Sequence, residues 1–480
     1  MHKRTKIVCT IGPSSSSSTV IEALVKAGLN VARINFSHGT HESNGKLIDL
    51  VRKAAEKVKS PVAVIGDLQG PRIRVGVLPP EGLILKKGSL VKINVSLIKA
   101  NDGQIPVTYK NLIKDLSVNE RILFDDGKLE LLAKKIQGHI IEAEVIVGGT
   151  LTSNKGINLP DSTVSINALT VKDKEDLKFI ITKDVDFVAL SFVKSAQDVL
   201  DLRFLIKDLS GKQAAKKKKP EIKIISKIEK HEAIKNIDEI IDASDGIMVA
   251  RGDLGLEMPA EEVPLLQKRI ISKCLEAAKP VIVATQMLES MTHNPRPTRA
   301  EVSDVANAVI DHTDAVMLSG ETASGEYPIE AVEIMSKVIK RTESSIFDDL
   351  PYNEFFDSKQ KTDTVMSGLS RLLAERIKAK AILAASLSGE TGRQISRFRP
   401  ELLIFVSTDN EKVQRQLNLS WGIIPFILPT CRTVEELIER SLVYLRKGKL
   451  NKKSDKLIII AGEPVGAAGG VNWVEVKEVD

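Results

Sequence analysis

Several polar residues stand at the ends of short apolar runs in this chain, where they could act together in one site. The clearest pair is Lys227 and Glu229, which close the run IKIISKIE at 222–229. Residues two apart share one face of a strand. Charged side chains beside a core are retained when they are paired or used in chemistry. We therefore interpret this lysine and this glutamate as functional residues.

A second acid, Asp253, lies in the sequence ARGDLG at the end of another apolar run. The carboxylates of Glu229 and Asp253 suit a hard divalent cation such as Mg2+, whose other positions are filled by substrate oxygens and water. Lys227 and Arg33 would add positive charge, which suits a substrate with phosphate, carboxylate or enolate oxygens. The other polar residues at run ends are Asn35, Ser37, Asp67, Ser191, Thr285, Ser319 and Glu321. There is no Walker-type glycine loop and no His/Cys grouping for zinc.

The apolar runs themselves predict the elements that position these residues. They are rich in Val, Ile and Ala, as strands of a covered parallel sheet are, and most are followed by a helical pattern. Eight strand–helix units predict a (β/α)8 barrel, whose strands converge at their carboxyl ends and would gather the polar residues into one cup. The eight expected strands are 5–12, 29–36, 61–68, 185–193, 222–229, 245–253, 280–287 and 314–321.

The spacing of the runs predicts three domains in an α/β protein. We expect the barrel to comprise residues 1–68 and 160–345. Residues 69–159 contain Gly and Pro turns and alternating runs, and they predict a small β-barrel inserted into a βα loop as a lid. Residues 346–480 alternate helix and strand patterns, which predicts an α/β domain with a mainly parallel sheet that could serve regulation or oligomerisation.

Composition narrows the class of protein. The chain has 480 residues, 42% of them hydrophobic, and a net charge of +6, which permits anionic substrates without demanding them. Three widely spaced cysteines suit a reducing compartment, and with no signal peptide or membrane-spanning run we expect a cytoplasmic protein. The basic run KKKKP at 216–220 has no aromatic residues beside it, so we do not expect it to bind nucleic acid.

Taken together, the motifs resemble the pyruvate kinase family over essentially the whole chain and in the family's order. The matching stretches are TKIVCTIGPSS, NVARINFSHGTHE, DLQGPRIR, NKGINLP, DFVALSFV, IISKIEKHEA, DGIMVARGDLG, VIVATQMLESM, PTRAEVSDVANAV and AVMLSGETASGEYP. The resemblance implies a barrel, an inserted lid and a C-terminal α/β domain. It also implies the last reaction of glycolysis, which moves the phosphoryl group of phosphoenolpyruvate to ADP and gives ATP and pyruvate.

The resemblance also implies roles for individual residues. Glu229 and Asp253 would hold Mg2+ or Mn2+, Lys227 would stabilise the transferring phosphoryl group and the enolate, and Arg33 would clamp the phosphate. The backbone at Gly252 and Asp253 and the hydroxyl of Thr285 would hold the substrate carboxylate, with a water near Thr285 delivering the proton to the enolate. The expected nucleotide contacts are Asn35, Phe36, Ser37, His38, Arg74 and Lys155, with Arg74 also counted as catalytic. The usual family assembly is a homotetramer.

The residue at position 72 bears on whether the protein requires a monovalent cation, K+. By resemblance, the K+ ligands would be Asn35, Ser37, Asp67 and the carbonyl of Leu68. Members that need K+ usually carry glutamate at the position of Arg72, and members that work without it carry lysine. An arginine is permanently charged, so we hypothesise that Arg72 supplies the positive charge beside Asp67 and that K+ is not required. The alternative is that Arg72 faces solvent and Asp67 still holds an ion.

Two other functions remain open from the sequence alone. A barrel lyase or aldolase acting on pyruvate-type substrates would share the carboxylates and basic residues, but it would not need ADP. A catalytically silent scaffold could use the lysine run to bind a polyanion. The turn SLSGETGR at 386–393 precedes a helix and could hold a phosphorylated effector.

Overall fold

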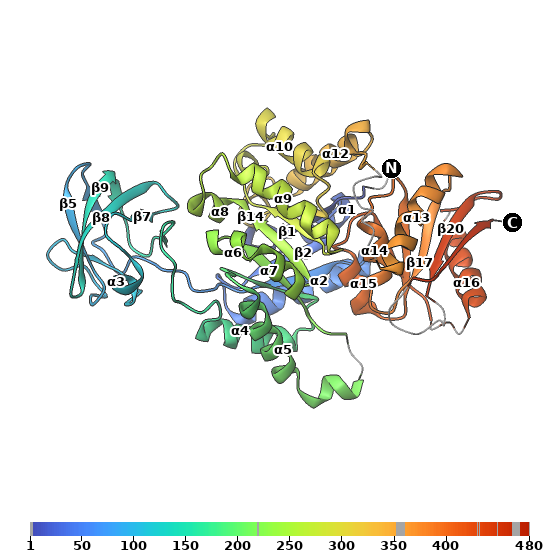
Figure 1. Ribbon diagram of the computed structural model, residues 1–480, viewed down its shortest axis with the longest axis horizontal. Helices are drawn as coiled ribbons and strands as arrows, with labels where there is room; N and C mark the ends of the chain where they lie inside the picture. The colour runs from blue at the N-terminus through green and yellow to red at the C-terminus, as the bar shows by residue number, and fades with distance from the viewer. Residues whose placement is uncertain are drawn as a thin grey trace.

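The computed structural model describes residues 3–217, 220–351, 361–429, 431, 433–448, 450–462 and 471–479. Three bodies follow one another along its longest axis (Figure 1). The barrel lies in the middle, the inserted β-rich part projects on one side, and the C-terminal α/β part packs on the opposite side.

The central body is a closed barrel of eight parallel strands, as the sequence predicts. Its strand order is β1-β16-β15-β14-β13-β12-β3-β2. All four residues of β12, β15 and β16 are buried, because helices cover the outside of the barrel and side chains fill its interior. The strands are β1 Lys6–Thr10, β2 Val31–Asn35, β3 Ala63–Asp67, β12 Phe187–Leu190, β13 Lys223–Ile228, β14 Gly246–Ala250, β15 Val281–Ala284 and β16 Ala315–Leu318.

Helices connect these strands, and several begin at a capping side chain. Thr298 accepts a hydrogen bond from the backbone N–H of Glu301 and starts α10, and Thr170 caps α4 in the same way. The helices are α1 Ser18–Ala27, α2 His41–Val58, α4 Val171–Thr182, α5 Ala196–Lys217, α6 His231–Lys235, α7 Ile237–Ala243, α8 Arg251–Glu257, α9 Val263–Glu276, α10 Arg299–Ile310, α11 Gly320–Ala323 and α12 Pro328–Thr342.

The strands are shorter than the apolar runs, and this corrects two assignments. Asp253 does not lie on a strand, because β14 ends at Ala250 and α8 begins at Arg251. Asp253 is therefore in the first turn of a short helix, where the helix dipole favours a carboxylate. Glu321 likewise lies in helix α11 rather than on a strand.

The inserted part contains a six-stranded sheet, a two-stranded sheet and one short helix. The six-stranded sheet has the order β11-β7-β8-β9-β5-β6, and β10 pairs with β4. Its own hydrophobic core includes Ile93, Phe124 and Ile141, all fully buried. The elements are β4 Leu83–Leu85, β5 Leu90–Asn94, β6 Ile105–Pro106, α3 Leu112–Asp115, β7 Arg121–Phe124, β8 Leu129–Gln137, β9 Ile140–Val147, β10 Gly149–Leu151 and β11 Ile157–Asn158.

The C-terminal part is a five-stranded sheet with helices. Its order is β19-β18-β17-β20-β21, and β21 runs antiparallel to β20 while the other pairs are parallel. The sequence predicted the parallel strands but not β21. The elements are α13 Thr362–Arg376, β17 Ala381–Ala385, α14 Glu390–Ser396, β18 Leu403–Thr408, α15 Glu411–Leu417, β19 Ile423–Ile427, α16 Val434–Lys447, β20 Lys456–Ala461 and β21 Trp473–Glu478.

The C-terminal part docks on the amino-terminal end of the barrel strands. The indole of Trp421 lies between two guanidinium groups, those of Arg4 at 5.0 Å and Arg399 at 5.2 Å from the ring centroid. Arg399 also pairs with Asp314 of the barrel at 2.8 Å. This contact leaves the carboxyl ends of the strands free for the site. Within the described ranges, the search for a helix with the length and apolarity of a membrane span finds no candidate.

Candidate active site

Lys227 lies at the centre of a buried polar cluster at the carboxyl end of the barrel. Its ammonium Nζ is 2.8 Å from Glu229 Oε1, 3.6 Å from Asp67 Oδ1, and it donates to Ser191 Oγ at 2.8 Å. Burial alone would lower the pKa of Lys227, but the carboxylates of Asp67 and Glu229 outweigh burial, so the pKa is raised. The lysine is therefore held protonated in a site that is almost closed to water.

Arg33 and Asp67 form the second half of the cluster. Arg33 Nε donates to Asp67 Oδ2 at 2.6 Å, and its Nη1 donates to Thr10 Oγ1 at 2.9 Å. The two residues meet because β2 and β3 are parallel neighbours, with Arg33 opposite Ile65 and Asn35 opposite Asp67. The Asp67 side chain is 1% exposed, and its Oδ1 accepts no hydrogen bond from the described residues. Asp67 thus faces two cationic groups with one oxygen still available.

Glu229 and Asp253 are the expected metal ligands. Burial raises the pKa of Glu229; Lys227 opposes this shift and the nearby charge of Asp253 adds to it. One oxygen of Glu229 faces Lys227, and the other accepts from the backbone N–H of Phe192 at 2.7 Å. Two carboxylates that repel each other in a buried site are stabilised by a divalent cation between them. The donor set therefore fits Mg2+ or Mn2+.

Thr285 lies directly after β15 in a strained backbone conformation. Its φ is 70°, in the left-handed region that β-branched residues avoid. Its Oγ1 accepts from the Gly252 N–H at 2.7 Å and donates to the Ala284 carbonyl at 2.6 Å. The Gly252 N–H expected to hold a substrate carboxylate thus already bonds to this hydroxyl. Thr285 and Gly252 are joined into one unit at the mouth of the barrel.

Arg251, which is absent from the predicted site residues, braces this unit. Arg251 pairs with Asp304 of α10 through both terminal nitrogens at 2.7 Å. It also donates to the Thr285 carbonyl at 2.9 Å. The only signal in the sequence was its place in ARGDLG, because Asp304 is 53 residues away. Arg251 thereby fixes the strained segment from behind.

The expected nucleotide residues that follow β2 differ in their surroundings: some lie in a turn, and one is buried in the core. Asn35 Oδ1 accepts from the Ser37 N–H at 3.1 Å, and His38 is exposed in the same turn. Phe36 differs from the expectation, because its side chain is 2% exposed and belongs to the main hydrophobic core. Its carbonyl accepts from Lys172 at 2.7 Å. The ring of Phe36 therefore packs in the core, and a nucleotide would meet this residue through its backbone only.

Among the residues on the insertion and its connections, Arg72 differs from the expectation that it lies beside Asp67. Arg72 does not lie on Asp67: its Nη2 pairs with Asp126 Oδ1 at 3.2 Å, between two largely exposed side chains. Lys155 pairs with Asp125 at 2.8 Å, and Arg74 forms an isolated β-bridge with Gly156. The three basic residues therefore stand on the insertion and its connections, apart from the Asp67 cluster.

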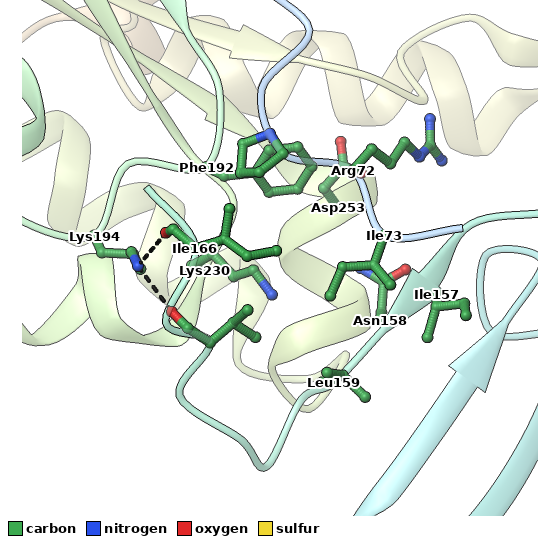
Figure 2. A pocket seen from close by; sticks show the side chains of 12 residues that line it. Arg72, Ile73, Ile157, Asn158, Leu159, Ile166, Phe192, Lys194, Lys230 and Asp253 are labelled. Atoms are coloured by element: carbon green, nitrogen blue, oxygen red, sulfur yellow. Dashed lines mark hydrogen bonds between the residues drawn. The ribbon is translucent and has the colours of Figure 1, made fainter. Parts of the chain in front are cut away.

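A pocket lies where the insertion joins the barrel (Figure 2). Asp253 and Lys230 come from the barrel, and Ile157 and Asn158 come from β11. Lys194 closes one side, because its Nζ donates to the carbonyls of Val164 and Ile166 at 2.8 Å each. The lining is Pro71, Arg72, Ile73, Ile157, Asn158, Leu159, Val164, Ile166, Phe192, Lys194, Lys230 and Asp253. One expected metal ligand thus faces a largely apolar pocket at the hinge.

The remaining expected residues are structural in their contacts. Leu68 offers its carbonyl to Ser191 Oγ at 2.7 Å, and Ser191 in turn accepts from Lys227. Glu321 accepts from the N–H groups of Leu288 and Ser319, so it ties two loops together. In the C-terminal turn, Arg393 pairs with Glu390 of the same helix. The side chains of the lysine run at 216–219 lie outside the described residues.

The whole chain can now be compared with known proteins. Residues 2–332 match the family model described as pyruvate kinase, barrel domain, and residues 365–477 match the one described as pyruvate kinase, alpha/beta domain. The chain is 43% identical to a pyruvate kinase from Geobacillus stearothermophilus, covering 100% of this chain and 81% of that protein. It is 41% identical to a pyruvate kinase from Clostridium acetobutylicum, with 100% of both covered.

A solved structure agrees with the sequence comparisons. A pyruvate kinase from Cryptosporidium parvum superposes with a TM-score of 0.93 and 36% identity, covering 99% of this chain and 96% of that one. These matches favour the kinase over the lyase or aldolase alternative, and they extend over barrel, insertion and C-terminal part alike. The chain belongs to the pyruvate kinase family.

Proposed function

We propose that the cluster around Lys227 transfers a phosphoryl group from phosphoenolpyruvate to ADP, with a divalent cation held by Glu229 and Asp253. The observation that carries this proposal is a buried ammonium with Glu229, Asp67 and Ser191 within 2.8–3.6 Å. Phosphoryl transfer relies on positioning and on charge stabilisation more than on covalent chemistry. A preformed cationic centre beside a pair of carboxylates is what that reaction needs.

Each basic residue has a distinct task in this proposal. The bound divalent cation would neutralise charge on the substrate oxygens. Lys227 would stabilise the charge on the transferring phosphoryl group and on the enolate oxygen it leaves. Arg33 uses two of its N–H donors on Asp67 and Thr10, and its remaining donors would clamp the phosphate.

The pyruvate end of the substrate would meet the unit formed by Gly252, Asp253 and Thr285. The backbone there and the Thr285 hydroxyl would hold the carboxylate after exchanging their present bonds, Gly252 N–H to Thr285 Oγ1 and Thr285 Oγ1 to the Ala284 carbonyl, for bonds to the substrate. After the P–O bond to the enol oxygen breaks and the bond to ADP forms, the enolate carbon takes a proton and becomes the methyl group of pyruvate. Because the Thr285 hydroxyl is held by Gly252 and Ala284, we assign it to orienting the water that delivers this proton.

ADP would lie between the turn after β2 and the insertion. Asn35, Ser37 and His38 would meet it from the barrel. Arg74 and Lys155 would meet it from the insertion, which would act as a lid over the bound nucleotide. Lys155 pairs with Asp125 on the surface at 2.8 Å, so nucleotide phosphates would compete with that carboxylate.

The test is direct. Pyruvate formation should require phosphoenolpyruvate, ADP and Mg2+ together, because a lyase or aldolase would turn over without ADP. Glu229→Gln should abolish turnover while the fold is kept. Turnover without ADP, or full activity in Glu229→Gln, would refute the proposal.

K+ is a separate question that the Asp67 geometry makes testable. Asp67 Oδ1 accepts no hydrogen bond from the described residues, so it has room for one more cationic partner. We propose that Arg72 leaves Asp126 when the lid closes and supplies this charge, so that K+ is not required. Arg72→Glu should then make activity depend on K+. Arg121→Glu breaks another ion pair of the insertion, with Asp161 at 2.8 Å, and should not. Equal K+ independence of the two variants would contradict the idea.

The assembly and compartment are proposed on family grounds. We expect a cytoplasmic homotetramer, and sedimentation velocity at micromolar concentration would separate a tetramer from a monomer or dimer. A phosphorylated effector would bind near the turn at 386–393, and its effect would be seen as a shift in the phosphoenolpyruvate concentration at half-maximal rate.

A further inference from the structure

A second group of possible metal ligands lies at the base of the lid hinge, outside the proposed active site. His231 and Glu232 are the first two residues of α6, and Glu257 is the last residue of α8. One ligand atom from each lies within 4.8 Å of the others. The three residues come together because α6 and α8 follow neighbouring strands, β13 and β14.

The atoms that face this cluster are shielded from water and have no hydrogen-bond partner among the described residues. They are His231 Nδ1, both carboxylate oxygens of Glu232, and Glu257 Oε2. The Glu257 side chain is 1% exposed. Buried polar atoms nearly always have a partner, since leaving them without one costs about 1–3 kcal/mol each. Three of these atoms, His231 Nδ1, Glu232 Oε2 and Glu257 Oε2, face one another without a hydrogen bond, which suggests that a ligand belongs between them.

The two distances from the imidazole nitrogen to the carboxylate oxygens fit a four-coordinate ion. His231 Nδ1 is 3.3 Å from Glu232 Oε2 and 3.6 Å from Glu257 Oε2. Bonds of about 2.0–2.2 Å at tetrahedral angles place neighbouring donor atoms about 3.3–3.6 Å apart. One imidazole nitrogen with carboxylate oxygens suits Zn2+, Co2+ or a similar transition ion more than Mg2+.

Glu257 is also held in the orientation that a ligand would need. Its Oε1 faces Lys230 Nζ at 2.6 Å and accepts from Asn158 Nδ2 at 3.4 Å, so Oε2 is turned toward His231. Such outer contacts orient metal-binding carboxylates in many proteins. The two carboxylates of Glu232 and Glu257 outnumber the single ammonium of Lys230 beside them, and this excess of negative charge would attract a divalent cation.

We propose that His231, Glu232 and Glu257 bind a divalent transition-metal ion, with water in the fourth position. The site is distinct from the Glu229–Asp253 pair, whose ligands are all oxygens. It joins the start of α6 to Glu257 at the end of α8, the helix that carries Asp253, and Glu257 also contacts Asn158 of the insertion. An ion there would fix the barrel side of the hinge next to the reacting centre.

The test uses Co2+ as the probe in full-length protein carrying Glu229→Gln, so that the proposed catalytic site is weakened. Four-coordinate Co2+ absorbs visible light far more strongly than six-coordinate Co2+. We expect the strong absorption at one equivalent and its displacement by Zn2+. His231→Asn in the same background should weaken binding at least about tenfold, because even a lost outer contact costs about 10–100-fold. His293→Asn removes an exposed histidine paired with Glu326 and should change nothing.

A second measurement covers the possibility that a variant misfolds. Anomalous diffraction at the cobalt edge, from crystals of the unaltered protein, should show a peak about 2.0–2.2 Å from His231 Nδ1. The competing occupant is a proton on His231, which would let the imidazolium bridge the two carboxylates without any metal. Absence of the absorption, its survival in His231→Asn, or anomalous density only at Glu229 and Asp253 would overturn the proposal.

Discussion

Replacement of Lys227 by methionine is the sharpest test of the proposed site. The substitution keeps most of the unbranched stem but removes the ammonium, which leaves the side chain one atom shorter. That ammonium is 2.8 Å from Glu229 and 3.6 Å from Asp67. At an effective dielectric constant of about 20, these two distances correspond to gross attractions of about 6 and about 5 kcal/mol. Most of this offsets the cost of burying three charges, so the gross figures are upper limits.

The net effects on stability and on catalysis are what remains after the cost of burying the charges is subtracted from the gross attraction. Removing one partner of a buried charge cluster costs about 3–5 kcal/mol of folding stability. Arg33 still faces Asp67 at 2.6 Å, so we expect the lower end of that range. Losing a preformed positive charge beside a transition state typically costs about 10²–10³-fold in kcat, and an arginine finger is worth about 10³–10⁵-fold. We therefore expect kcat to fall about 10³-fold, which is about 4 kcal/mol.

The assay needs a control that separates lost chemistry from lost stability. Lys6→Met is matched, because Lys6 is also a buried lysine and burial lowers its pKa to about 8. Lys6 lies at the opposite end of the barrel and donates to the Ile423 carbonyl at 2.6 Å. It should keep kcat, whatever the balance between the lost hydrogen bond and the relieved burial of a charge does to stability. Both enzymes would be measured at saturating phosphoenolpyruvate, ADP and Mg2+, with folding checked by circular dichroism.

Two results would refute the reasoning. If Lys227→Met retains kcat within tenfold of the unaltered protein, Lys227 does not stabilise the transition state. If Lys6→Met loses kcat to the same extent, the loss reports general loosening of the barrel.

Three further outcomes are expected. Thr285→Ala should lower kcat by about 10²-fold, within the range for proton-transfer groups, while Thr285→Ser retains most activity; equal rates for the two variants would rule out a role for the hydroxyl. Removal of divalent cations with a chelator should abolish pyruvate formation, and Mg2+ or Mn2+ should restore it; residual turnover would argue against the carboxylate pair. Burial raises the pKa of Asp348 to about 7, so its ionisation opposes folding increasingly from pH about 4 to about 7. Asp348→Asn should then increase the free energy of unfolding at pH 8 by up to about 4 kcal/mol, seen as a higher midpoint of thermal unfolding. Near pH 4 the variant should show no gain. A gain that does not change with pH would contradict this assignment.

Local pattern was enough to predict the elements that frame the site. The apolar runs predicted all eight barrel strands, because each strand is buried on both faces and must be apolar along its length. The spacing of Lys227 and Glu229 placed them on one face, and they lie 2.8 Å apart. The motifs also predicted the family, which the comparisons confirm.

Other features could not be predicted from local pattern. Asp253 was placed on a strand because the apolar run continues up to it, yet the chain turns into α8 at Arg251. Phe36 was grouped with polar neighbours, yet its side chain enters the core. β21 lies in a polar stretch and pairs only because β20 offers it an antiparallel edge.

The sequence by itself determined which residues could do chemistry and at which end of the barrel they would meet. Alternation along a strand and the convergence of barrel strands are properties of the backbone, and they can be read from spacing. Only the tertiary structure decided which charged side chains pair with one another. Arg72 pairs with Asp126, 54 residues away, and not with the nearby Asp67. His231 meets Glu257 because α6 and α8 follow two adjacent strands, β13 and β14. Such encounters depend on how the domains pack, since a charge takes the partner that the fold brings within reach.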